Sequence, residues 1–239
     1  SLLLTPFVSA QEAKTKLMIY CGVTMSKAIA DIADLFKQQH PDLDIVILRG
    51  GSKDLYDTIN ASRVGDLYLP GEPVHLSDRW DNNLFAESVN IGVNQVALMV
   101  VKGNPKAVQP DLQQLLRKDL VTVLSTPDQG AIGVMTQKIL DRYDLYEAAI
   151  AHASLLMSDG RSLTQAIQRG EGDLCLNWKA GISFAPNDVE VIPLPDDISP
   201  KQPLLLTKLI FSKQEVLAEQ FMQFAAGEQG QIIMRRYGF

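Results

Sequence analysis

Hydroxyl residues stand at points where an apolar, strand-like run is followed at once by a helical pattern. Thr24 follows the run KLMIYCGV, and Ser52 follows the run DIVILRGG. The first turn of a helix leaves backbone N–H groups without partners, and the helix dipole adds partial positive charge there. Such an end binds an anion without any Lys or Arg. These residue types therefore predict chemistry in which an anion is held rather than transformed.

The same strand-to-helix pattern occurs four times along the chain. The segments are KLMIYCGVTMSKAIADIADLF (16–36), DIVILRGGSKDLYDTIN (44–60), VTVLSTPDQGAIGVMTQKIL (121–140) and SLLMSDGRSLTQAIQRG (154–170). A Ser or Thr at one helix start alone is explained as an N-cap, whose oxygen accepts a backbone N–H. A hydroxyl that accepts in this way still has its own proton to donate to a ligand. Anion binding is favoured over plain capping only if several of these helix starts converge in one cleft.

Sequence motifs for catalysis are absent. The chain has no GxxxxGK[ST], GxGxxG, GxSxG or HExxH motif. The three histidines, His40, His75 and His152, have no Cys, Asp or Glu at metal-ligand spacing. The sequence therefore indicates a binding protein rather than an enzyme, with no cofactor and no directly bound metal cation.

Composition limits the partners of this chain. Of its 239 residues, 46% are hydrophobic and 21% are charged, which is typical of a globular protein. The net charge of −6 disfavours nucleic-acid binding, which usually needs a basic face. No stretch of the sequence reaches the roughly 18 apolar residues of a membrane span, so insertion into a membrane is not expected.

The N-terminal sequence SLLLTPFVSA is typical of the end of a secretory signal peptide. An apolar run, Leu2-Leu3-Leu4, precedes the small-residue cleavage pattern Val8-Ser9-Ala10. Residues 1–10 are therefore predicted to be the remnant of a signal peptide and the protein to be periplasmic; an ordinary apolar strand is the alternative. Although export permits a disulfide, Cys21 and Cys175 lie in apolar strand-like runs, which favours two buried free thiols.

Alternating strand and helix patterns from residue 16 to about 180 predict an α/β fold with mainly parallel sheets flanked by helices. Two stretches, 94–101 and 192–200, are expected to connect two lobes, the second leading to a strand over 204–209. The first lobe would comprise 11–95 plus 200–239, and the second lobe 96–199. The last helix is expected to run from Lys213 to about Arg236.

In their order and spacing, several segments resemble the periplasmic molybdate/tungstate-binding proteins of ABC importers. The segments are IYCGVTMSKAIADIADLF (19–36), GGSKDLYDTI (50–59), GDLYLPGE (65–72), TPDQGAIG (126–133) and the C-terminal Arg236-Tyr237-Gly238-Phe239. The resemblance implies the type II periplasmic-binding-protein fold, with a ligand cleft between the two lobes. It also implies a monomer that captures a small tetrahedral oxyanion by hinge closure and delivers it to the membrane permease of an ABC importer.

The resemblance also implies which residues bind the anion. The family's two hydroxyl donors fall on Thr24 and Ser52, its two backbone donors on Ile132 and Gly160, and its tyrosine on Trp178. Secondary candidates are the neighbouring residues Val23, Gly51 and Gly133, together with Arg161.

Two departures from the family pattern bear on the identity of the ligand. Trp178 offers one N–H and no hydroxyl, and it is larger than the family's tyrosine. Asp54 lies in the first turn after Ser52, where a carboxylate would compete with an anion for the helix end unless it points outward. Arg161 could pair with a carboxylate-bearing ligand. A binding protein or a sensor for another small anion, such as a carboxylate-bearing solute, is therefore the alternative.

Overall fold

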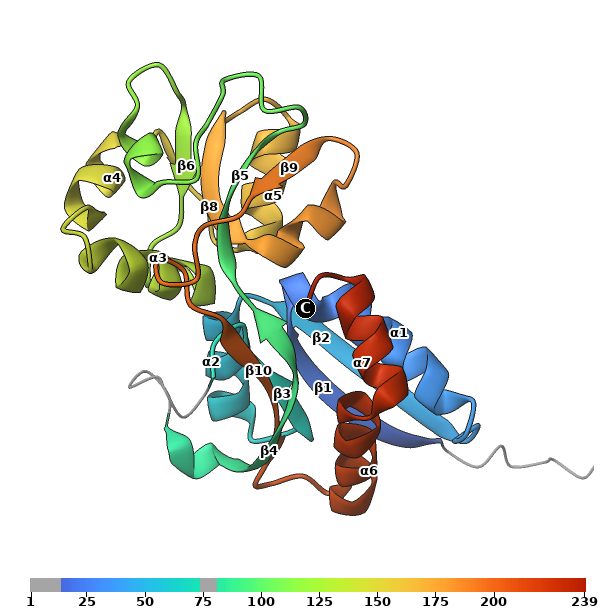
Figure 1. Cartoon of the computed structure of the whole chain (residues 1–239). Helices are drawn as coiled ribbons and strands as arrows, with labels where there is room; N and C mark the ends of the chain where they lie inside the picture. Colours follow the sequence, from blue (N-terminus) through green and yellow to red (C-terminus); the bar gives the residue numbers. More distant parts are fainter. Residues whose placement is uncertain (1–13, 74–80) are drawn as a thin grey trace, which may run out of the picture.

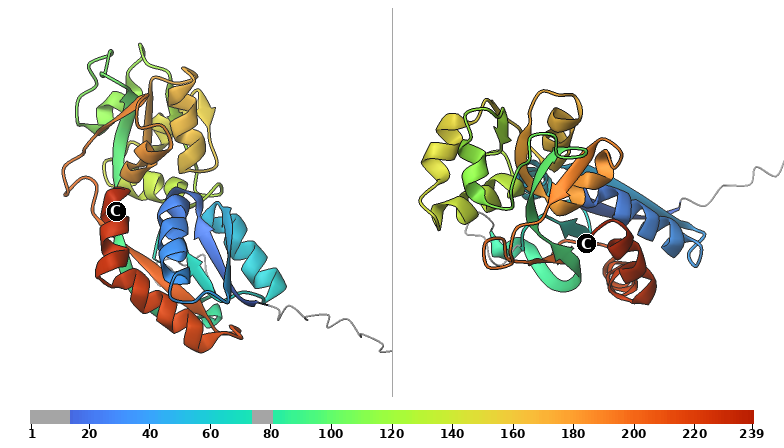
Figure 2. Two further views of the ribbon diagram at one scale, coloured as in Figure 1. Left: turned by 90° about the vertical axis from the view of Figure 1, so that its right-hand side faces the viewer. Right: turned by 45° about the horizontal axis from the view of Figure 1, so that its top comes forward.

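A computed structural model describes residues 14–73 and 81–239 of the chain (Figure 1). The expected signal-peptide remnant at 1–10 and His75 lie outside the described residues. The described chain forms two lobes, each built on one five-stranded sheet flanked by helices. Figure 2 shows the same two lobes from two other directions.

Lobe I is the part that contains both ends of the described chain. Its strands are β1 (Thr15–Gly22), β2 (Leu43–Gly50), β3 (Leu67–Leu69), β4 (Phe85–Asn94) and β10 (Gln202–Leu209), in the order β2-β1-β3-β10-β4. Its helices are α1 (Ser26–Lys37), α2 (Ser52–Ser62), α6 (Glu215–Ala226) and α7 (Glu228–Arg236), with short 3₁₀ helices η1 (Val23–Met25) and η3 (Asn82–Leu84). Because side chains alternate along a strand, Ile19 of β1 packs in the core shared with α1 and α6, while Tyr20 packs with α2.

Lobe II is built in the same manner. Its strands are β5 (Val96–Val101), β6 (Thr122–Leu124), β7 (Leu155–Leu156), β8 (Leu174–Trp178) and β9 (Val189–Ile192), in the order β7-β6-β8-β5-β9. Its helices are α3 (Ala131–Asp141), α4 (Tyr146–His152) and α5 (Gly160–Gln168), with 3₁₀ helices η4 (Leu112–Leu116) and η5 (Lys179–Phe184). All five residues of β8 are buried, as expected for a strand covered on both faces.

Both sheets are mixed, because the strands that connect the lobes run antiparallel to their neighbours. In lobe I, β1 is parallel to β2 and β3, whereas β10 is antiparallel to β3 and β4. In lobe II, β6 is parallel to β7 and β8, whereas β5 is antiparallel to β8 and β9. The α/β fold with two lobes is confirmed; the limits assigned to each lobe from the sequence stay a prediction.

The two connections between the lobes are bonded to each other. Gln95, the one residue between β4 and β5, donates from Nε2 to Asp196 Oδ1 at 2.9 Å and to the Ser199 carbonyl at 2.7 Å. The Ser199 hydroxyl in turn donates to the Val96 carbonyl at 2.6 Å. Because these two segments are the connections between the lobes within 14–73 and 81–239, a change in the angle between the lobes would be absorbed here.

Two further sequence expectations have clear outcomes. The single helix expected over 213–236 is wrong: α6 ends and α7 begins at Gly227, whose extended backbone (φ −76°, ψ 179°) breaks the helix. The expectation of two buried free thiols is confirmed, and burial raises the pKa of both Cys21 and Cys175. Within 14–73 and 81–239, none of the helices has the length and apolar character needed to cross a bilayer.

Candidate functional site

A small cavity lies between the lobes where four helices begin. Its volume is about 20 Å³, far below the several hundred cubic ångströms of pockets for drug-sized molecules. The residues that line it are Gly22, Val23, Thr24 and Met25 around η1; Gly50, Gly51 and Ser52 at α2; Gly71; Gly130, Ala131 and Ile132 at α3; Ser158, Asp159 and Gly160 at α5; and Trp178.

Several backbone N–H groups at these helix starts have no acceptor within their helix, although that of Ser162 in α5 is bonded to the Asp159 side chain. In α2, α3 and α5, the first bond to the residue before the helix is donated by the fourth helical residue: Leu55 to Gly51, Val134 to Gly130 and Leu163 to Asp159. The preceding N–H groups have no acceptor inside their own helix. Four helix ends that face one small space therefore concentrate donors and partial positive charge there.

Two hydroxyl groups add to these backbone donors. Thr24 is 5% exposed and Ser52 is 4% exposed. Ser52 Oγ accepts the Gly71 N–H at 3.0 Å, so the hydroxyl proton is left to point elsewhere. No hydrogen bond joins the Thr24 hydroxyl to another described residue, and a Cβ built on Gly160 would lie 2.7 Å from Thr24 Oγ1. The Thr24 hydroxyl of lobe I therefore meets the start of α5 in lobe II.

Trp178 closes one side of the cavity. A Cβ built on Gly160 would lie 3.2 Å from its Cδ1, and a Cβ built on Gly71 would lie 3.3 Å from its Cζ2. The edge of the indole that carries Nε1 is therefore placed between glycines of opposite lobes. Asn177 holds this arrangement, because its Oδ1 accepts the Trp178 N–H at 2.8 Å and its Nδ2 donates to the Gly160 carbonyl at 2.9 Å.

Formal charge is nearly absent from the cavity. None of the described residues that line it is Lys, Arg or His, and Asp159 is the one carboxylate among them. Asp159 is the N-cap of α5: its Oδ1 accepts the Ser162 N–H at 2.8 Å, and its Oδ2 accepts the Ser158 hydroxyl at 3.3 Å. Asp54 is exposed and is not part of the lining, although a Cβ built on Gly51 would lie 3.8 Å from its Oδ2, so its carboxylate lies beside the start of α2 and outside the cavity.

Most residues predicted from the sequence come together at this cavity. The structure brings Thr24, Ser52, Ile132, Gly160, Trp178, Val23 and Gly51 into its lining. Gly133 of α3 does not line the cavity. It packs against the loop before α3, where a Cβ built on it would lie 1.9 Å from the Thr126 carbonyl oxygen. Arg161 is exposed and lies over the Phe184 ring, 5.9 Å from its centroid. What each lining residue contributes to a ligand stays a prediction.

Several lining residues were not predicted from the sequence. They are Gly22, Met25, Gly50, Gly71, Gly130, Ala131, Ser158 and Asp159. Asp159 could have been found, because an Asp before a helical pattern is a strong N-cap signal. Gly71 carries no such signal, since it belongs to none of the four helix starts and reaches the cavity only through the packing of the loop after β3.

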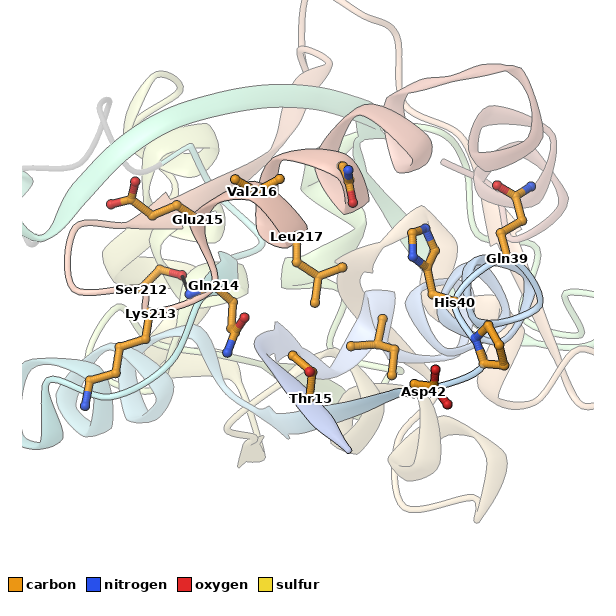
Figure 3. Close-up of a pocket in the computed structure, with 13 residues that line it drawn as sticks. Thr15, Gln39, His40, Asp42, Ser212, Lys213, Gln214, Glu215, Val216 and Leu217 are labelled. Atoms are coloured by element: carbon orange, nitrogen blue, oxygen red, sulfur yellow. Dashed lines mark hydrogen bonds between the residues drawn. The ribbon is translucent and has the colours of Figure 1, made fainter. Parts of the chain in front are cut away.

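A larger groove of about 800 Å³ lies elsewhere on lobe I. It separates the residues around the start of α6 from those that follow α1, and Figure 3 shows Leu217 and His40 among the side chains at its walls. The groove contains one helix start, that of α6. At the interlobe cavity, by contrast, four helix starts converge. The interlobe cavity is therefore the better candidate for an anion site.

Two α/β lobes joined by two crossing segments, with a cavity between them, define a two-lobed ligand-binding protein. The chain belongs to the bacterial extracellular solute-binding protein family, which it matches over residues 17–239. No curated protein sequence matches it.

Solved structures with the same fold bind different ligands. The periplasmic molybdate-binding protein of Azotobacter vinelandii has a TM-score of 0.73 at 16% identity, covering 93% of this chain and 97% of its own. The sulfate-binding protein SubI of Mycobacterium tuberculosis has a TM-score of 0.76 at 18% identity, covering 94% and 86%. Iron-bound HitA of Pseudomonas aeruginosa has a TM-score of 0.70 at 16% identity, covering 93% and 84%. The shared fold therefore leaves the ligand to be argued from the cavity.

Proposed function

We propose that this protein captures a small tetrahedral oxyanion, of the molybdate or tungstate kind, between its lobes. The observation that carries the proposal is the convergence of four helix starts on a cavity of about 20 Å³ whose described lining contains no Lys, Arg or His. A site of dipoles and hydroxyls suits an anion, since the backbone N–H groups and hydroxyls at those ends are donors, and the one carboxylate, Asp159, is bonded as the N-cap of α5.

Five donors are assigned to the ligand. They are the hydroxyls of Thr24 and Ser52, the backbone N–H groups of Ile132 and Gly160, and the indole N–H of Trp178. A dianion loses much hydration energy on entering a closed cleft, and a hydrogen bond to a charged group returns about 1.5–3 kcal/mol. Several such bonds from both lobes offset that loss, and they are made together only when the lobes are closed.

The same donors would select among anions. A protonated ligand oxygen would present its proton to a donor and leave both groups unpaired, which disfavours protonated forms. The cavity size further favours a compact ion over an organic acid. Capture by hinge closure, delivery to the permease of an ABC importer, and a periplasmic location after cleavage behind Ala10 complete the proposed role, in which the protein acts as a monomer and not as an enzyme.

Isothermal titration of the ligand-free protein with molybdate, tungstate, sulfate and phosphate tests the ligand. Submicromolar binding of molybdate and tungstate alone would support the proposal and assign the role of the family's tyrosine to Trp178. Binding of sulfate or phosphate instead would keep an oxyanion site and change its preferred ion. Absence of heat with all four anions would reject an oxyanion site and favour the alternative, a small carboxylate, as the next ligand to test.

Ser52→Ala tests the site itself. Removing one donor to a charged ligand should weaken binding about tenfold or more, given 1.5–3 kcal/mol for such a bond, while the protein stays folded. Ser62→Ala, at the exposed far end of the same helix, is the matched control and should bind like the parent protein. Unchanged affinity in Ser52→Ala would remove Ser52 from the site.

A further inference from the structure

A buried amide connects the crossing segment between the lobes to one of the two hydroxyl donors. Asn94 is the last residue of β4, and after Gln95 the chain enters β5 in lobe II. Asn94 also pairs with Gln202, the first residue of the returning strand β10. Both connections between the lobes therefore meet at Asn94, which is 1% exposed.

The side chain of Asn94 reaches the cavity through the backbone of one residue, Gly71, whose carbonyl and N–H lie on either side of its Cα. Its Nδ2 donates to the Gly71 carbonyl at 3.4 Å. The N–H of Gly71 donates to Ser52 Oγ at 3.0 Å. Because the Ser52 oxygen is occupied as an acceptor, its proton is directed away from Gly71. Gly71 and Ser52 both line the cavity, so this chain of bonds sets the direction of the Ser52 proton.

Burial of the polar Asn94 side chain lowers the stability of the fold. Its Oδ1 is fully buried and has no hydrogen-bond partner among the described residues. A buried acceptor left without a partner destabilises the fold, and an apolar side chain of the same shape would avoid that loss. What a polar side chain contributes at position 94 is therefore its donor, the Nδ2 group that bonds the Gly71 carbonyl.

Gly71 also contacts lobe II. A Cβ built on it would lie 3.2 Å from the Ala131 Cβ and 3.3 Å from Trp178 Cζ2. Gly71, whose carbonyl accepts from Asn94, is thus the point of lobe I that contacts both the start of α3 and the indole of Trp178 when the cleft is closed.

We infer that Asn94 is a positioning residue: by holding the Gly71 carbonyl it restrains the Gly71 backbone, so that the Gly71 N–H stays on Ser52 Oγ and the Ser52 hydroxyl donates into the cavity. The inference rests on the proposed function for its effect on affinity. The bonds themselves lie within lobe I, so they can also be tested without any ligand.

Amide hydrogen exchange of Gly71 in the ligand-free protein is the first test. Asn94→Ala should speed exchange at Gly71 about fivefold or more, because Gly71 loses the bond at its carbonyl that limits its backbone motion and so helps to keep its N–H on Ser52. Asn94→Leu, which keeps the side-chain volume, should do the same and serves if the alanine variant does not fold. Asn90→Ala on the same strand is the control and should leave Gly71 unchanged. Unchanged exchange in both Asn94 variants would overturn the inference whatever the ligand is.

A double-mutant cycle with molybdate is the second test. Asn94→Ala should weaken binding about three- to tenfold in the parent protein but less than about twofold in the Ser52→Ala background, because coupled residues are not additive. An equal loss in both backgrounds would mean a merely structural role and would overturn the inference. If the parent protein binds none of the four oxyanions, the proposed function fails, and Gly71 exchange alone decides the role of Asn94.

Discussion

The absence of side chains shapes the cavity as much as their presence does. At Gly160, the space that a Cβ would take is already occupied by Thr24 Oγ1 at 2.7 Å, Asn177 Oδ1 at 3.0 Å and Trp178 Cδ1 at 3.2 Å. Thr24 belongs to the other lobe, so the contact exists only when the lobes are together. Glycine at this helix start therefore allows a donor of lobe I to approach the backbone of lobe II.

Gly160→Ala should weaken oxyanion binding about tenfold or more, because overpacking typically costs about 1–3 kcal/mol and here it falls on the closed form. Titration with molybdate measures the loss. Gly51→Ala is the matched control: it stands at another helix start of the same cavity, but its Cβ would have 3.6 Å to the Gln129 carbonyl oxygen and 3.8 Å to Asp54 Oδ2. The affinity of Gly51→Ala for molybdate should stay within about twofold of that of the parent protein. Equal effects of the two alanines would contradict the packing argument.

Residue types at helix starts were predictable, whereas the residues that orient them were not. Thr24 and Ser52 carry a local signal, a hydroxyl next to a helical pattern. Gly71 lies 19 residues after Ser52, and Asn94 lies 23 residues after Gly71. Their bonds depend on how β3 and β4 are placed in the sheet, and single-sequence patterns do not report that placement.

At the scale of elements, the four strand-to-helix units are all present, because hydrophobic periodicity and the strand-to-helix boundary are encoded locally. The C-terminal region shows the limit of such patterns. A helical pattern on both sides of Gly227 predicted one helix, but residues 227–231 carry no apolar side chain, and α7 packs as a separate helix against α6 and β4. Figure 1 shows α6 and α7 as separate helices on the face of lobe I that also carries α1.

Gly230→Ala should destabilise the protein, although alanine normally favours a helix over glycine by about 0.5–1 kcal/mol. Gly230 lies in α7, and its Cβ would be 2.1 Å from the Ala225 carbonyl oxygen in the last turn of α6. Because the clash is with backbone, relief requires the two helices to move apart. A fall in Tm of about 2–8 °C is expected from about 1–2 kcal/mol. Gln229→Ala, on the exposed side of α7, should change Tm little. A rise in Tm for Gly230→Ala would show that the corner between α6 and α7 relaxes freely.

At the scale of the whole molecule, the proposed donors are divided between the lobes, so the proposed function links binding to closure. Thr24 and Ser52 come from lobe I, and Ile132, Gly160 and Trp178 come from lobe II. At the edge of the cleft, Lys27 Nζ of α1 donates to the Ser183 carbonyl of η5 at 2.9 Å and lies 5.3 Å from the Phe184 ring centroid. A ligand that needs both sets of donors favours the closed arrangement by its difference in affinity for the two states.

Trp178 should report this closure through its fluorescence. In the closed arrangement it is 3% exposed and packs against Gly71 of the other lobe, so opening of the cleft would expose the indole to water. Adding molybdate to the ligand-free protein is expected to shift the emission maximum to shorter wavelength. The sequence has two tryptophans; the shift should persist in Trp80→Phe and disappear in Trp178→Phe. A shift that survives Trp178→Phe would mean that Trp178, which lines the cavity, is not the residue that reports closure. A shift that depends on Trp178 and saturates at the ligand concentration found by titration would tie closure and binding to the same site.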